Sequence, residues 1–576
     1  MAPITDDEWA DLVAQELPKS SDLVIRKYLE SRSALMAEEQ KQRSDHSFRQ
    51  ALSPIARRAC DIVSRIRDEE RRETNRAISK ETTRSWQIIR RMPKGALLRA
   101  ACHSFIDIDH LLDAALKTPW MHISCLNGNL ATEMARADAD LCFRFRKAET
   151  NPVDNSSLWA DDYKPGTFVP LGETAESYPD GGSEGFVGWL KEKCTIPRQT
   201  GDRRERWRAT SRCADVISGM LFYEPIWRVF LRQLMSNLVK DGVYWLELRL
   251  TFPLAYYRAE CETPDPHYDH LFQALGEELA RFQATSAGRP FWGLRVIWST
   301  LRRQDPRSII EDADSCIATK LMCPHMVAGY DLAGPECLGR SLADLLPELF
   351  WFRKQCAMED VQIPFFLQAG GRFGFAESGE GAETESNLFD AILLGTRRIA
   401  NAASLHRHPR LVEAVKDKRI LVEASPVLLC GGGGTAEPTR RQISAHHPLP
   451  ALLAQGVPCA LTHDDGGFGI PLEHRQAAGS RTTDVFWQVL QTWDSIDLAG
   501  LGSLAENSVR WAAFEDQDAE MWAREIRAAS VGAGVKSTRL QQWAVEWERF
   551  CLWIVTEYGD TYGEGSKDDE DADAPQ

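Results

Sequence analysis

Eight short apolar runs, separated by helical segments, occupy most of this chain. Each run is rich in Val, Ile, Leu or aromatic residues, and most lack the polar alternation of a strand with one exposed face. Strands buried on both faces of a parallel sheet show this pattern. Eight such strands alternating with helices close a (β/α)8 barrel, so we predict an α/β fold of this type. The runs are Gly95–Cys102, Tyr244–Thr251, Phe291–Thr300, Met326–Ala333, Pro364–Gly370, Arg397–Ser404, Arg419–Pro426 and Pro458–Asp465.

The flanking segments have a different pattern. Residues 1–90 show helical spacing with charged outer faces, which predicts an N-terminal helical arm packed on the main body. Residues 91–555 hold the predicted barrel. Within them, prolines and glycines interrupt residues 147–188, and we predict an insertion loop there. Residues 556–576 are acidic at their end, which predicts a disordered tail.

Charge and composition exclude several classes of function. The net charge of -16 disfavours binding to nucleic acid, because phosphates attract basic surfaces. The sequence contains no run of about 18 apolar residues, the length that a membrane span needs. The amino-terminal residues do not have the pattern of a secretory signal. The 14 cysteines lack the paired spacing of a metal site, so we expect reduced thiols and a cytoplasmic protein.

Polar residues gather where the predicted strands end. In a (β/α)8 barrel the reactive groups lie at the carboxyl ends of the strands and in the loops that follow. Glu247 lies on the second strand, and we expect it to be structural, paired with Arg249 or Arg99. The polar residues of the other run ends are His103, Asp331, Gln368, Asn401, Glu423, Ser425, His463, Asp464 and Asp465.

Several longer motifs resemble one family. Residues 92–98 read Met-Pro-Lys-Gly-Ala-Leu-Leu, and residues 330–336 read Tyr-Asp-Leu-Ala-Gly-Pro-Glu. Residues 387–399, the His-Pro-Leu-Pro segment at 447–450 and the pair Asp464-Asp465 extend the match. Together they resemble the growth-factor-type adenosine deaminases, over about residues 5–555. The resemblance is greatest to cytosolic fungal members of that family, and it implies a barrel of the metallo-dependent hydrolase type.

The resemblance also implies a set of reactive positions. In the family, zinc is held by a His-x-His motif after strand one, a His on strand five and an Asp on strand eight, and it activates a water molecule. A Glu in a His-Ala-Gly-Glu motif protonates the purine, and a His after strand six orients the water. In this chain the ligand positions hold Arg99, Ala101, Gln368 and Asp464, and the two proton-transfer positions hold Gly371 and Asn401.

Three of the four implied zinc ligands are therefore replaced. Arg99 places a fixed cation where a divalent ion would bind, and we expect it to pair with Asp464. We expect no zinc cofactor and no deamination by the family's mechanism. Asp465 and Gly334 match substrate contacts of the family, so Asp465, Gly334 and Arg99 are the candidate ligand-binding residues.

Three functional hypotheses remain open. The first is a pseudoenzyme that binds a nucleoside-like small molecule or a protein partner, with a homo-oligomer also possible. The second is an enzyme that has been repurposed for metal-free acid–base or lyase chemistry, using His103, His463, Asp464 or Asp465. The third is residual adenosine deamination or hydrolysis on a rebuilt metal site. No nucleic-acid or membrane partner is expected.

Overall fold

The computed structural model describes most of the chain, with gaps. The described residues are 4–15, 17–19, 21–72, 79–147, 157–195, 203–371, 381–426, 447–462 and 481–562. Among the predicted site residues, His463, Asp464 and Asp465 lie outside these ranges, so the expected Arg99–Asp464 pair does too.

Eight parallel strands form the central sheet. Four of them pair in the order β1-β5-β6-β7, and the other four pair in the order β8-β9-β10-β11. A parallel bridge between Tyr330 and Phe365 joins the two groups. The strands are β1 (Gly95–Ala101), β5 (Val243–Phe252), β6 (Gly293–Leu301), β7 (Val327–Ala333), β8 (Phe366–Ala369), β9 (Arg398–Asn401), β10 (Leu421–Ala424) and β11 (Cys459–Leu461).

The packing of the sheet interior shows that it curves into a barrel. One buried cluster joins side chains of seven strands, including Leu98 of β1 and Ala460 of β11, which lie at opposite ends of the strand order. Arg398 of the remaining strand, β9, stacks on Phe366 of this cluster. Helix α20 (Leu498–Arg510) contacts both β1 and β11. The predicted (β/α)8 barrel is therefore confirmed, and each predicted run overlaps one of its strands.

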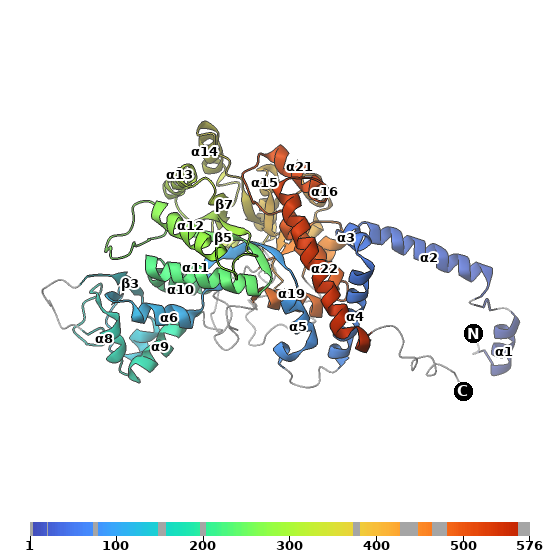
Figure 1. Ribbon diagram of the computed structural model, residues 1–576, viewed down its shortest axis with the longest axis horizontal. Coiled ribbons are helices and arrows are strands. Elements are labelled where there is room, and N and C mark those ends of the chain that lie inside the picture. The colour runs from blue at the N-terminus through green and yellow to red at the C-terminus, as the bar shows by residue number, and fades with distance from the viewer. Residues whose placement is uncertain are drawn as a thin grey trace.

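Helices surround the barrel (Figure 1). The helices between β1 and β11 include α10 (Arg203–Leu221), α11 (Glu224–Lys240), α12 (Asp269–Gln283), α13 (Pro306–Met322), α14 (Leu346–Met358), α15 (Gly381–Leu393), α16 (Pro409–Asp417) and α18 (Leu449–Ala454). After β11 the chain forms α19 (Arg481–Thr492), α20, α21 (Ala519–Ala528) and α22 (Val535–Tyr562). Short 3-10 helices occur at Lys80–Thr82, Cys102–Phe105, Glu336–Leu338 and Leu405–Arg407.

The N-terminal arm does not pack on the body along its whole length, contrary to our prediction. Its helices are α1 (Asp6–Gln15), α2 (Leu23–Lys41), α3 (His46–Ala51), α4 (Pro54–Arg72) and α5 (Arg84–Arg91). Helix α4 buries an apolar face and contacts α22. Helix α2 has no buried residue, and Figure 1 shows it extending away from the rest of the molecule.

The insertion is more ordered than the predicted loop at 147–188. Its described part contains β4 (Val169–Pro170), α8 (Leu171–Glu176) and α9 (Gly182–Lys193). Strand β4 pairs with β2 (Met121–Cys125), which also pairs with β3 (Leu141–Phe145), in an antiparallel sheet beside α6 (Ile108–Lys117) and α7 (Glu133–Ala137). The rings of Trp159, Tyr178 and Trp189 pack together in its core. The prolines and glycines therefore mark ends of elements here.

Residues 556–562, which we predicted to belong to the tail, are helical. Helix α22 continues to Tyr562, whose hydroxyl donates to Glu69 of α4. This tertiary contact extends the helix beyond the apolar pattern, and the acidic residues after 562 lie outside the described ranges. Among the described helices, none combines the length and the apolar character that a membrane crossing needs.

Candidate functional site

The carboxyl ends of β1 and β8 bring two of the replaced positions together. Nη2 of Arg99 donates a hydrogen bond to Oε1 of Gln368 at 3.0 Å. Both side chains are buried, with 5% of each residue exposed. Because β1 and β8 are not neighbours in the sheet, this contact crosses the barrel interior. The two residues thus lie together in the barrel interior, and this hydrogen bond joins their side chains.

The Arg99 guanidinium also joins a network of buried charges, which we call the barrel network. Its Nη1 lies 3.3 Å from Oδ2 of Asp331 and 3.9 Å from Oε2 of Glu423. Arg249 of β5 donates to the same two carboxylates, at 2.7 Å and 3.0 Å. Two cations therefore face two anions, and each carboxylate has a partner of opposite charge.

Arg398 of β9 extends the barrel network toward the amino ends of the strands. Its Nε donates to Oε1 of Glu423 at 2.7 Å, and its Nη2 donates to Glu247. Glu247 also accepts from the indole of Trp245 and from the backbone N–H of Ala513. The expected structural role of Glu247 fits these contacts, but its cation is Arg398 rather than Arg249 or Arg99.

The six members of the barrel network balance in charge: three arginines and three carboxylates. Burial acts to raise the pKa of Glu423, but Arg249, Arg398 and Arg99 outweigh it, and the pKa lies below its usual value. Burial lowers the pKa of Arg249, and the facing carboxylates of Asp331 and Glu423 oppose that effect. Glu423 is therefore ionised near neutral pH, held by the arginines around it.

The zinc site that the resemblance implies does not fit these residues. A zinc ion needs imidazole, thiolate or carboxylate ligands that are free to coordinate it. The first position holds a guanidinium, the second a methyl group on Ala101, and the third a carboxamide whose oxygen accepts from Arg99. A divalent cation placed there would lie against the Arg99 cation.

The position that the resemblance implies for a proton donor holds Gly371, which has no side chain. A carboxylate is nevertheless close: Oε1 and Oε2 of Glu336 accept from the backbone N–H groups of Gly371 and Gly370, at 2.9 Å and 3.2 Å. Asn387 also donates to Oε2 of Glu336. Burial raises the pKa of Glu336, against the effect of Arg302. These bonds fix the turn after β8 and engage both carboxylate oxygens.

The end of β9 keeps an unusual backbone. Asn401 and Ala402 both have positive φ, at 71° and 46°. Residues other than glycine rarely adopt this region, and such strain is often found at functional sites. The resemblance implies that Asn401 stands where the family has its water-orienting His, and the amide Nδ2 of Asn401 is buried without a hydrogen-bond partner among the described residues.

His103 lies just beyond β1, at the rim of the barrel. One of its ring nitrogens is 2.9 Å from the hydroxyl of Ser218 on α10. Burial lowers the pKa of His103 to about 4, so the imidazole is neutral at pH 7. The other candidates for metal-free chemistry, His463, Asp464 and Asp465, lie outside the described residues.

Gly334 follows β7 with a φ of 102°, a value that favours glycine. Its surroundings are carbon atoms of Trp207, Leu301 and the aliphatic part of Arg302. A Cβ added at this position would lie 3.9 Å from the indole of Trp207 on α10 and 3.9 Å from the side chain of Arg302. Gly334 and Trp207 thus offer a flat aromatic neighbour beside a backbone N–H group.

Sequence reasoning named the ends of the strands but missed how their charges pair. Asp331, Arg249 and Glu423 were singled out as polar residues, yet Arg398 was not. The signal was present as two consecutive arginines, Arg397 and Arg398, at the start of a predicted strand and directly before Ile399 and Ala400. Arginine inside a buried strand requires a buried carboxylate, and Glu247 and Glu423 supply two.

Comparisons with known proteins identify relatives along most of the chain. Human adenosine deaminase 2 is 22% identical over 486 residues, which span 83% of this chain and 82% of that protein. An adenosine deaminase of Phlebotomus duboscqi is 24% identical over 483 residues, spanning 82% and 79%. A zinc-bound amidohydrolase structure from Burkholderia ambifaria matches with a TM-score of 0.48 at 14% identity, over 84% of this chain and 98% of that one. No family model matches.

Proposed function

We propose that this chain is an adenosine-deaminase-like protein of the growth-factor type that binds a nucleoside-like ligand without zinc-dependent deamination. The proposal combines a retained scaffold with altered reactive positions. The relatives named adenosine deaminase cover about four fifths of the chain. The positions that would hold zinc and transfer protons carry Arg99, Ala101, Gln368, Gly371 and Asn401.

One observation carries the proposal: the hydrogen bond from Arg99 to Gln368, inside the barrel network. Two of the implied ligand positions bond to each other. The Arg99 cation is further compensated by Asp331, at 3.3 Å. Freeing this position for a divalent ion would cost the buried hydrogen bond and leave uncompensated charge, each of which is expensive in a low-dielectric interior.

The residues around Gly334 support a ring-shaped ligand. A backbone N–H at the end of β7 donates to a heterocyclic nitrogen without needing a metal. The indole edge of Trp207 lies beside Gly334, and the Arg303 guanidinium lies over one face of that ring, so we propose that a flat ligand ring packs against the indole here. Pockets for small molecules combine apolar or aromatic walls with a few oriented polar groups. Adenosine and related nucleosides have both a flat ring and hydrogen-bonding groups.

Adenosine tests the proposal directly. We expect adenosine or a non-reacting analogue to raise the melting temperature of the full chain, because a ligand that binds only the folded state stabilises it. We expect no inosine to form in the same samples. Inosine formation that a chelator abolishes would refute the proposal that zinc-dependent deamination is lost. The absence of any thermal shift with a panel of nucleosides would refute the proposal that the ligand is nucleoside-like.

A second candidate is metal-free acid–base chemistry at the barrel rim, which the neutral His103 favours. A neutral imidazole paired with Ser218 can accept a proton from a substrate. A screen of small metabolites, followed through loss of substrate, would find such turnover. His103→Ala should abolish it while the melting temperature of the apoprotein stays within a few degrees. A screen without turnover contradicts this candidate and leaves the binding proposal intact.

A further inference from the structure

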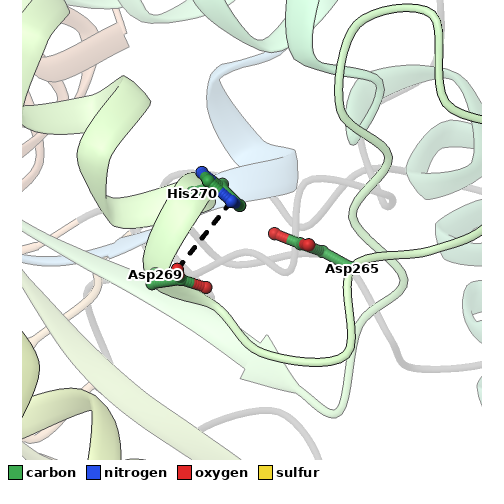
Figure 2. Close-up of side chains that lie close together, drawn as sticks. All are labelled: Asp265, Asp269 and His270. Carbon is green, nitrogen blue, oxygen red and sulfur yellow. Dashed lines mark ion pairs between the residues drawn. The ribbon is translucent and has the colours of Figure 1, made fainter.

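Outside the barrel network, three potential metal ligands converge after β5. Figure 2 shows the side chains of Asp265, Asp269 and His270 directed toward one another. One ligand atom from each lies within 4.8 Å of the others, and Oδ2 of Asp269 is 3.9 Å from Nε2 of His270. Asp265 lies in the loop that leads into α12, and the other two residues begin that helix.

The Asp265 carboxylate is unusually placed for a loop residue. Only 4% of its side chain is exposed, and its Oδ2 is buried without a hydrogen-bond partner. A buried carboxylate oxygen without a partner is costly, because the ionised group loses its hydration. Its other oxygen, Oδ1, lies 3.4 Å from Nε of Arg258. The carboxylate thus has coordinating capacity that the described protein atoms leave unused.

Arg258 shows that the cluster already attracts a cation. Its Nη1 lies 3.4 Å from Nε2 of His270. Because arginine is only a donor, this contact places the lone pair of His270 Nε2 toward the guanidinium. The Arg258 side chain is 46% exposed, so it can move into solvent. The same lone pair and the two carboxylates are then available to an ion.

We propose that Asp265, Asp269 and His270 form a site for a divalent cation of the zinc class, which displaces the Arg258 guanidinium. One imidazole and two carboxylates are ligands that zinc accepts at about 2.0–2.2 Å, with a water molecule as the fourth ligand. Tetrahedral geometry at that distance places ligand atoms roughly 3.4 Å apart. The side chains must therefore close by about 1 Å, and the partly exposed Asp269 and His270 have room to do so.

Such an ion would be structural and separate from the barrel network. None of its ligands belongs to that network, and it would join the loop after β5 to the first turn of α12. Zinc found in the purified protein would then be bound at this loop without any deaminase activity.

The experiment is titration of the full chain, freed of tags and of metal, with zinc chloride by calorimetry. We expect one zinc ion per chain. Asp265→Asn and His270→Ala should each weaken binding at least tenfold, because each removes a ligand. Arg258→Ala should strengthen binding several-fold, because the competing cation is gone. His110→Ala is the matched control: His110 pairs with a single carboxylate, Asp107, and its loss should leave zinc binding unchanged.

Cobalt gives an independent readout. Visible absorption of bound Co²⁺ reports its coordination, so the wild-type spectrum should disappear in Asp265→Asn and His270→Ala. Three outcomes would overturn the proposal: no zinc binding, binding that both variants leave unchanged, or weaker binding in Arg258→Ala. Unchanged binding that comes with inosine formation would place the ion in the barrel, and would refute the proposed function as well.

Discussion

Replacing Arg249 with methionine tests whether the barrel network holds the fold together. Arg249 is almost fully buried and contacts Asp331 at 2.7 Å and Glu423 at 3.0 Å. Methionine fills much of the same volume but carries no charge. Asp331 would then keep Arg99, at 3.3 Å, and the more distant charge of Arg302, and Glu423 would keep Arg398 and the more distant Arg99.

The structure sets the size of the expected effect. Removing one partner of a buried ion pair costs about 3–5 kcal/mol, because the remaining charge is buried without compensation. Arg249 pairs with two carboxylates, which places the expected loss of stability in the upper half of this range. Arg99 and Arg398 remain near these carboxylates and reduce the loss in part. The assay is urea unfolding followed by tryptophan fluorescence, in which the midpoint should fall strongly.

Two further variants make the result interpretable. Arg307 forms a surface pair with Glu311 at 2.7 Å, and 87% of its side chain is exposed. Arg307→Met should leave the urea midpoint unchanged, because solvent screens such pairs. Adding Glu423→Gln to Arg249→Met should recover part of the lost stability, because one uncompensated charge is removed. If Arg249→Met unfolds at the same urea concentration as the wild type, the reasoning about the barrel network is wrong.

Three other predictions concern acid, glycine and lysine. Burial lowers the pKa of His447 to about 4, below its value in the unfolded state. The neutral imidazole therefore contributes about 3 kcal/mol to the free energy of unfolding, in full above pH 6.5, and this contribution is lost as the pH falls toward 4. In thermal melts, His447→Gln should make stability less dependent on pH across that window. Gly370→Ala should lower the melting temperature, because φ is 88° and the added Cβ would lie 2.8 Å from Leu388. Burial lowers the pKa of Lys536 to about 7, so between pH 7 and pH 10 the unfolded chain binds a proton that the folded chain does not. The melting temperature should therefore rise from pH 7 toward pH 10. Lys536→Met should lack that rise.

The sequence predicted the barrel because its strands are buried on both faces. Leu97, Leu98, Val296 and Ile297 make the pattern continuous and apolar, and that pattern depends on local sequence alone. The insertion was predicted poorly because its order depends on contacts between distant aromatic residues. Prolines and glycines dominate the local pattern at 147–188, whereas Trp159 and Trp189 stabilise the fold there.

The candidate site was predicted in position but not in pairing. The resemblance placed Arg99 and Gln368 near each other, and the structure describes a hydrogen bond between them. Their carboxylate partners depend on which side chains meet across the barrel interior, which strand order and register determine. The partnership of Glu247 with Arg398 instead of Arg249 is one such case. The cluster at Asp265 likewise depends on the path of a loop.

Adenosine turnover by the full chain carrying Asp265→Asn, assayed with added zinc, tests the central claim most directly. The substitution removes the proposed loop site, so any remaining zinc chemistry would arise in the barrel. We predict that inosine does not form above the uncatalysed rate. Inosine that appears with zinc and disappears with a chelator would show that the barrel holds a working metal ion despite Arg99, Ala101 and Gln368.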